Sequence, residues 1–281
     1  MQRDFIFSKH LVSLVFYTSA MVVFGYGQSV PSSNEVNIIA VSKSDYGLIF
    51  TDIIVNGTTV RAMIDFGDPH SLQLSSTLVE QQKIAMRATG RQVSDVFGNT
   101  WELQEGSVEK VTIGNWAAAN VVFTSQNGEM EAVSEQIGTI FHAVVGWGYF
   151  KDYFTEIDYA DNKIILYKHQ PEISDHAFTT TFSIESGYLI LKAGFNGEDI
   201  YLMLDTGAPV TFIDSTFQAK YNIEQLQIEL GGALIILDVY AQDMSVLSDL
   251  GVVGMLGGDF LSAHRVFIDT QSNVLVFLRK E

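Results

Sequence analysis

The sequence predicts an all-β protein made of two homologous, β-barrel-like lobes with a cleft between them. Three observations lead to this fold class. Short runs rich in Val, Ile, Phe and Tyr alternate with Gly, Asn and Asp along the 281 residues, which is typical of strands joined by tight turns. A long segment of the first half of the chain recurs in the second half. Signals for helices are sparse.

The main repeat surrounds two aspartates, Asp65 and Asp205, which lie 140 residues apart. At this spacing residues 47–76 align without a gap on residues 187–216. A repeat of this length indicates two copies of one structural unit. The matching residues include Asn56 and Asn196, Gly57 and Gly197, Met63 and Met203, Gly67 and Gly207, and Pro69 and Pro209.

A second, shorter repeat lies near the end of each half. Residues 143–168 resemble residues 254–280, with Gly146 aligned on Gly257. The first half is longer because it carries a longer segment between its two repeats. We therefore expect the same elements in the same order in both halves.

The boundary between the halves lies where Pro171 and charged residues interrupt the β pattern. This break predicts an N-terminal lobe over residues 36–170 and a C-terminal lobe over residues 178–281. Residues 171–177 are predicted to be the linker between them.

Turn signals also recur in both halves. Asn-Gly stands between two apolar runs at 56–57 and again at 196–197, which predicts a two-residue hairpin turn at each place. Asp158 and Asp269 each precede a polar turn. We interpret both as turn-forming structural residues and not as catalytic ones.

Each half ends on an apolar run, at 162–168 and at 273–280, and both runs are predicted to be strands. The strongest helix signal covers residues 75–84. It begins with Ser75, a residue that favours the N-cap position of a helix.

The first 27 residues are predicted to be a cleaved export signal. Arg3 and Lys9 give a positive start, and residues 11–24 form an apolar run followed by small residues, so cleavage is expected near Gly27. A membrane anchor is the alternative, although the run is short and contains Ser and Thr. We expect an exported protein that is periplasmic, on the cell surface or secreted.

The composition excludes several classes of function. The net charge of −17 argues against nucleic acid as a partner. The chain contains no Cys, which excludes disulfides, thiolate metal sites and a Cys nucleophile. The six His residues lack the spacing of metal ligands, so no metal or cofactor is expected. We expect the protein to act as a monomer.

The residues around the second aspartate resemble the active-site loop of aspartic proteases. In residues 201–213, "YLMLDTGAPVTFI", an Asp-Thr-Gly-Ala sequence stands between apolar runs. "MLGGDFL" at 255–261 resembles the apolar-apolar-Gly element that accompanies this loop in each lobe of the family, and the first half has "VVGWGYF" at 144–150. The resemblance covers the chain from about residue 50 onward, and is to the two-lobed pepsin and retropepsin-like enzymes, the bacterial type in particular.

This resemblance implies a reason for the duplication. In the family, one carboxylate from each lobe holds a water molecule, and the two share one proton. It therefore implies an aspartic endopeptidase that acts on polypeptides, with Asp65 and Asp205 as the catalytic pair. Gly67 and Gly207 are expected to let each tight loop place its aspartate.

The first half departs from the family pattern. The Thr after each Asp forms a hydrogen bond to the opposite loop in the family, which Thr206 can do and Phe66 cannot. Asp68 stands where the second half has Ala208, and a third carboxylate raises the proton affinity of the pair unless it faces solvent or a cation. Neither position supplies the hydroxyl that pepsin-like enzymes use, so a less acidic working pH than theirs is expected.

Two hypotheses about function stay open at this point. The chain is either an active exported endopeptidase or an inactive, protease-like protein that binds a peptide in its cleft. Pairing of intact second lobes from two chains, as in retroviral enzymes, is disfavoured because one chain already holds two lobes.

A flap over the cleft is the last expectation. Residues 95–114 are predicted to form a hairpin in which Phe97 and Trp101 precede a turn near Gly106. The resemblance implies that such a hairpin closes over the substrate with an aromatic residue. Phe97 and Trp101 are therefore candidate substrate contacts.

Overall fold

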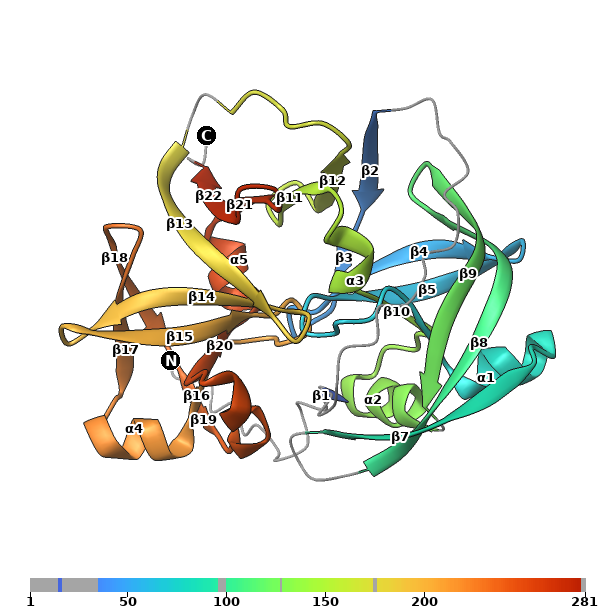
Figure 1. Ribbon diagram of the computed structural model, residues 1–281, viewed down its shortest axis with the longest axis horizontal. Coiled ribbons are helices and arrows are strands. Elements are labelled where there is room, and N and C mark those ends of the chain that lie inside the picture. Colours follow the sequence, from blue (N-terminus) through green and yellow to red (C-terminus); the bar gives the residue numbers. More distant parts are fainter. Residues whose placement is uncertain (1–14, 17–34, 96–99, 127, 174–175, 279–281) are drawn as a thin grey trace.

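The computed structural model describes residues 15–16, 35–95, 100–126, 128–173 and 176–278, which form two mainly β lobes joined by a shared sheet (Figure 1). The predicted signal, residues 1–27, lies outside this part of the chain except for strand β1 (Val15–Phe16), which pairs with β7. Within the described ranges, no helix has the length and apolar character needed to cross a membrane.

The N-terminal lobe is a curved sheet that closes on itself. Its strand order is β1-β7-β8-β9-β6-β10-β5-β4-β3, and β8 pairs with β4 as well. Helix α2 (Glu129–Ile137) packs against the sheet through Met130, Val133 and Ile137. The remaining elements are β3 (Ser42–Lys43), β4 (Ile49–Val55), β5 (Thr58–Asp65), β6 (Gln73–Leu74), α1 (Ser76–Gln82), β7 (Met86–Asp95), β8 (Thr100–Ile113), β9 (Trp116–Gln126), β10 (Ala143–Gly146) and α3 (Trp147–Phe150).

The C-terminal lobe repeats this plan with fewer and shorter strands. Its order is β19-β16-β20-β15-β14, with the β17–β18 hairpin attached to β14. The elements are β14 (Tyr188–Phe195), β15 (Glu198–Leu204), β16 (Phe212–Asp214), α4 (Ser215–Tyr221), β17 (Gln225–Leu230), β18 (Ala233–Asp238), β19 (Tyr240–Gln242), a 3₁₀ helix (Ser245–Leu250), β20 (Gly254–Leu256) and α5 (Gly258–Ala263).

A third, six-stranded region joins the lobes and contains strands from both halves. It runs in the antiparallel order β2-β12-β11-β21-β22-β13, at the top of Figure 1. Strand β13 begins inside the range predicted as the linker, 171–177. The bounds are β2 (Val36–Ala40), β11 (Phe154–Asp158), β12 (Lys163–Tyr167), β13 (His176–Glu185), β21 (Arg265–Asp269) and β22 (Val274–Leu278).

The local signals in the sequence account for many of these elements. Asn56-Gly57 and Asn196-Gly197 have positive φ angles and connect β4 to β5 and β14 to β15, as the hairpin signals predicted. The hydroxyl of Ser75 accepts a hydrogen bond from the Leu78 N–H at 3.2 Å, so the predicted cap begins α1.

The predicted turn near Gly106 is wrong. Gly106 lies in the middle of the continuous strand β8, opposite Met86 on β7 and Phe123 on β9. A Cβ atom at this position would lie 2.6 Å from the Met86 sulfur and 2.8 Å from the Phe123 ring. The glycine is therefore required for space and not for a turn. Strands β7 and β8 pair antiparallel as far as Ser94 and Thr100, and the candidate residue Phe97 lies outside the described part of the chain.

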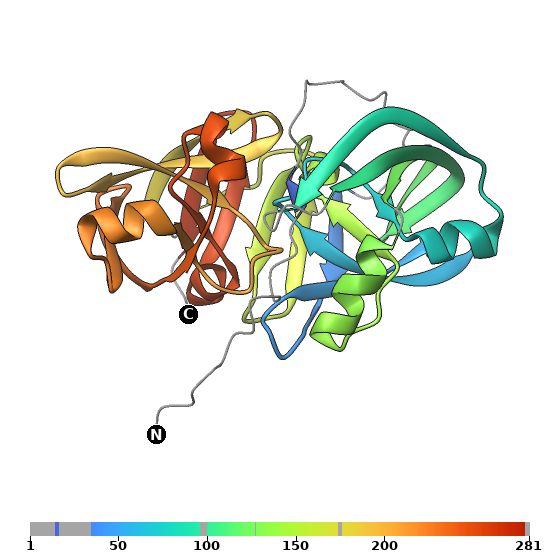
Figure 2. The ribbon, with the colours of Figure 1, turned by 90° about the horizontal axis from the view of Figure 1, so that it is seen from below.

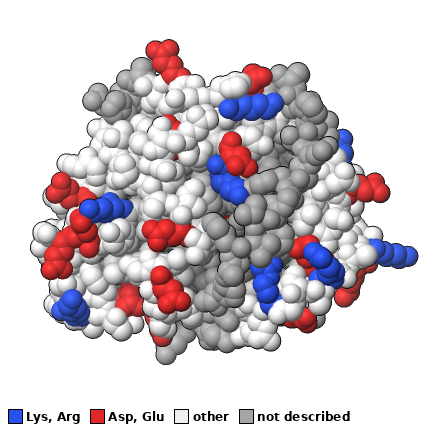
Figure 3. Space-filling model, in the orientation of Figure 1, with Lys and Arg blue, Asp and Glu red and all other residues white. Residues whose placement is uncertain are grey.

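Most large apolar side chains belong to one continuous core that extends through both lobes. A smaller cluster under α2 completes the N-terminal lobe, and another lies around Tyr188 and Met255 in the C-terminal lobe. Viewed from below, the lobes lie side by side with the shared sheet between them (Figure 2). On the face in Figure 3, acidic side chains occur in small groups among basic ones and do not form one patch.

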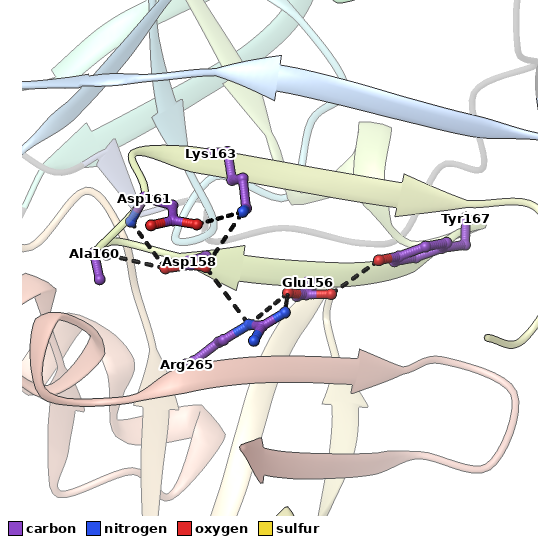
Figure 4. A network of polar contacts seen from close by, with 7 residues as sticks. All are labelled: Glu156, Asp158, Ala160, Asp161, Lys163, Tyr167 and Arg265. Carbon is purple, nitrogen blue, oxygen red and sulfur yellow. Dashed lines mark hydrogen bonds and ion pairs between the residues drawn. The ribbon is translucent and has the colours of Figure 1, made fainter. Parts of the chain in front are cut away.

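A polar network connects the two halves across the shared sheet (Figure 4). Arg265 on β21 donates to Glu156 on β11 at 2.6 Å and lies 3.5 Å from Asp158. Tyr167 donates to the other oxygen of Glu156 at 2.9 Å, and Lys163 lies 3.7 Å from Asp158. Glu156 is buried, and a buried carboxylate requires such partners.

We predict that Arg265→Met lowers the free energy of unfolding by about 2–3 kcal/mol, because it leaves the buried Glu156 carboxylate without its cation. Urea unfolding measures the change. Lys192→Met is the control, since the Lys192–Asp199 pair is exposed and water screens its charges, so its loss should change the stability far less. Equal losses in the two variants would contradict the assignment.

Candidate active site

Each half carries its aspartate on a loop that follows a central strand. Asp65 ends β5, and β10 runs parallel to β5 with Gly146 opposite Asp65. Asp205 follows β15, which pairs in parallel with β20, and its N–H donates to Leu256 O at 3.0 Å. In each half, an equivalent pair of parallel strands thus holds the aspartate loop, as the sequence repeat predicts.

The glycine that ends β10 and the one that follows β20 make room for these loops. A Cβ atom on Gly146 would lie 2.2 Å from the carbonyl oxygen of His70, and one on Gly257 would lie 2.3 Å from that of Val210. Any larger residue would therefore push the aspartate loop away from the strand beneath it. This close approach explains the apolar-apolar-Gly pattern in both halves.

The two aspartates meet between the lobes. The carboxyl group of Asp205 lies 2.6 Å from the point where Gly67 would carry a Cβ atom, and that of Asp65 lies 2.5 Å from the same point on Gly207. Each carboxyl group also accepts the N–H of the glycine two residues later, at 2.8 Å in both loops. The two carboxyl groups are therefore close enough to perturb each other's protonation.

Burial controls the protonation of this pair. Asp65 and Asp205 are 5% and 0% exposed. Desolvation, followed by the charges of Asp205 and Asp68, raises the pKa of Asp65 well above its usual value. Desolvation raises the pKa of Asp205 as well, but hydrogen bonds from Asp65 and from backbone N–H groups limit this increase. The pair therefore loses its protons in two coupled steps.

Thr206 holds the two loops together as expected. Its hydroxyl donates to Ile64 O and accepts from the Phe66 N–H, both at 2.9 Å and both buried. These bonds connect the second loop to the strand and the loop of the first half. The reverse connection is absent because Phe66 carries no hydroxyl.

The ring of Phe66 points into the core of its own lobe and is completely buried. It packs against Trp147 and Phe150, with ring centroids 5.2 Å and 4.7 Å away. Both partners belong to α3, directly after Gly146. The first loop is thus held by an aromatic cluster where the second loop has a threonine.

Asp68 is also buried and does not face solvent. Its Oδ1 accepts the backbone N–H of His70 at 2.9 Å and lies 2.9 Å from the His70 Nδ1, and its Oδ2 accepts from Gln73 at 2.7 Å. Arg61, which lies nearby in sequence, instead contacts Ser42 and the ring of Phe50. Ala208, which is the counterpart of Asp68 in the second half, is buried too.

A small hollow lies beside Asp65 in the N-terminal lobe. It has an apolar wall from the β5–β10 strands and α2, and a polar rim. The lining residues are Met63, Asp65, Asp68, Gln73, Glu129, Met130, Val133, Phe141 and Val144.

Sequence reasoning missed several of the residues near the pair. Gln73 and Glu129 line the hollow, and Tyr159 is buried, with its pKa raised by burial and by the charges of Asp205 and Asp65. None of them has a matching residue type in the second half: Tyr159, for example, aligns with Thr270. The repeat therefore gave no signal for them.

The sequence also predicted two candidate flap residues, Phe97 and Trp101. Phe97 is outside the described residues. Trp101 is on β8 and packs against Val93 and Leu103 within the hairpin. In the described ranges, no group of three or more His, Cys, Asp or Glu side chains is arranged to hold a metal ion.

No protein-family model matches this sequence, and no curated protein matches it. Among solved structures, the basic 7S globulin from soybean is similar in fold, with a TM-score of 0.55 over 87% of this chain and 95% of that chain. The sequence identity is 13%. That neighbour has a pepsin-like fold, so the all-β, two-lobed fold class is shown. It is named as a globulin and not as a protease, and the likeness concerns the fold alone.

We predict that Thr206→Val lowers the free energy of unfolding by about 2–3 kcal/mol, because two buried hydrogen bonds are lost and the Phe66 N–H is left without its acceptor. Thr206→Ser keeps the hydroxyl and should lose less than about 1 kcal/mol. Urea unfolding of both variants measures the difference. Similar losses would mean that the methyl group of Thr206, and not its hydroxyl, holds the loops.

We also predict that Phe66→Thr is destabilising although it restores the symmetry of the two loops. Removing the ring leaves a cavity beside Trp147 and Phe150 that should cost about 3 kcal/mol, whereas the new hydrogen bond should return about 1 kcal/mol. Thermal unfolding measures the balance, with Phe66→Leu as a control that fills more of the cavity. A stabilised Phe66→Thr protein would contradict this account.

Proposed function

We propose that this protein is an exported, monomeric aspartic-type endopeptidase. The observation that carries the proposal is the pair Asp65–Asp205, in which each buried carboxyl group from one loop lies against the glycine of the sister loop and both have raised pKa values. Two carboxyl groups that share a proton form an acid and a base in contact, which is the requirement for hydrolysing a peptide bond without a metal.

In the proposed reaction the ionised carboxylate takes a proton from a water molecule, whose oxygen attacks the peptide carbonyl carbon. The protonated carboxyl group donates its proton to the carbonyl oxygen. The C–N bond then breaks as the nitrogen receives the proton that was taken from water, and the other carboxylate regains its proton from a hydroxyl group of the tetrahedral intermediate. The buried setting supports this role, because charge interactions are strong where water is excluded.

The surroundings of the pair support a polypeptide as the substrate. The hollow beside Asp65 has an apolar wall that includes Met63, Met130 and Phe141. An apolar substrate group packed against this wall would bring the adjacent peptide bond next to Asp65. Its burial would contribute binding free energy in proportion to its apolar area.

An inactive, peptide-binding protein is the second candidate function. It is favoured by the departure of the first loop from the family pattern, since only one of the two connecting hydroxyl groups is present. The missing bond would loosen the positions of the reacting groups, and small displacements reduce catalysis strongly.

Digestion of unfolded casein between pH 3 and pH 8 distinguishes the two functions. We expect the wild-type protein to cleave casein, pepstatin to inhibit it, and Asp65→Asn and Asp205→Asn each to abolish cleavage. Asp249→Asn is the matched control, because Asp249 is exposed on the second lobe. An inert wild-type protein that still binds a peptide would establish the second candidate instead.

A further inference from the structure

We propose that Asp68 is a positioning residue for the proton of the pair: its fixed negative charge keeps the shared proton on Asp65 and leaves Asp205 as the carboxylate that activates water. This inference rests on the proposed function for its catalytic meaning. Its physical content, the location of one proton, can be tested without any catalytic activity.

The position of Asp68 is fixed at the backbone and at the side chain. Its N–H donates to Asp65 O at 3.2 Å, and its carbonyl oxygen accepts from the Trp147 N–H at 2.7 Å. Gln126 donates to the oxygen of the Gln73 amide at 3.3 Å, which leaves the Gln73 NH₂ group to donate to Asp68. The Gln73 NH₂ group and the His70 backbone N–H both present donors to Asp68, as an ionised carboxylate requires.

The difference in charge between the two loops comes from the side chain of Asp68. In the second loop the Gly258 N–H donates to Ala208 O at 2.8 Å, which matches the bond from Trp147 to Asp68. The backbones are therefore equivalent at this position, and only the first loop adds a charge. Asp65 and Asp68 belong to the same lobe, and both line the hollow.

The groups that face Asp65 come from four elements. Asp205 faces it from the second loop, Asp68 from its own loop, Glu129 lines the shared hollow from α2, and the phenol of Tyr159 comes from the turn after β11. The Nδ1 atom of His70 lies 2.9 Å from Asp68. A proton on Asp65 removes the repulsion from both neighbouring aspartates at once.

Asp205 is in the opposite situation. The backbone N–H groups of Gly207, Ala208 and Gly67 stabilise its charge, and no third carboxylate is on its own loop. The state with the proton on Asp65 and the charge on Asp205 is therefore the lower in energy.

The first test is the pH dependence of casein cleavage. Activity ends at high pH when Asp65 loses its proton, so Asp68→Asn and Asp68→Ala should move this upper limit down by about one pH unit. Asp52→Asn removes the same charge from an exposed position of the same lobe and should not move it. An unchanged upper limit in both Asp68 variants would overturn the proposal.

The second test uses unfolding and needs no activity. A buried acid whose pKa is raised in the native state keeps its proton while the unfolded chain releases it, so stability falls as pH rises from about 4 to the native pKa. We expect this fall to extend to higher pH in Asp205→Asn, where Asp65 remains, than in Asp65→Asn, where Asp205 remains. The reverse order would overturn the proposal, even if the Asp68 variants fail to fold.

Adding Asp68→Asn to Asp205→Asn completes this test. The upper end of the fall in stability should move down by about one pH unit relative to Asp205→Asn alone, and no movement would contradict the role of Asp68. A wild-type protein that cleaves nothing would remove the proposed function, whereas the order of these unfolding curves would still decide where the proton lies.

Discussion

The contact between each aspartate and the glycine of the opposite loop is the constraint on which the rest of the structure depends. Each carboxyl group occupies the space where a side chain on Gly67 or Gly207 would begin. The loops can only approach this closely if the strands beneath them are equally close, which Gly146 and Gly257 allow. The two halves must therefore keep the same backbone here, whatever their side chains do elsewhere.

Within that shared backbone the two loops are stabilised differently. The second loop uses the Thr206 hydroxyl, which reaches into the first half. The first loop uses the ring of Phe66, which packs inside its own lobe against Trp147 and Phe150. Aromatic packing of this kind stabilises the first lobe but does not connect it to the second lobe. The first loop has thus exchanged a connection to its partner for a better packed core, while Asp68 adds a charge that the second loop lacks.

Much of this fold could be read from the sequence, because the repeat and the Asn-Gly turns are local signals that leave few alternatives. The repeat also covers α4, because the residues of α4 align with those of α1. The helical pattern of α4 alone is too short to predict a helix. The role of Gly106 was predicted wrongly, because the sequence does not distinguish a glycine that makes room for Phe123 from one that forms a turn. The neighbours of the pair could not be predicted, because Gln73 and Tyr159 reach it through pairing between distant strands.

The mixed composition of the shared sheet has a consequence for how the chain is made. Strand β11 of the first half pairs with β21, which is synthesised more than a hundred residues later, after the second aspartate loop. Until then the nascent first lobe carries an exposed strand edge, a form that invites aggregation and favours capture by chaperones. The pair of aspartates can therefore assemble only after the second half has been synthesised, which keeps an isolated first half chemically silent.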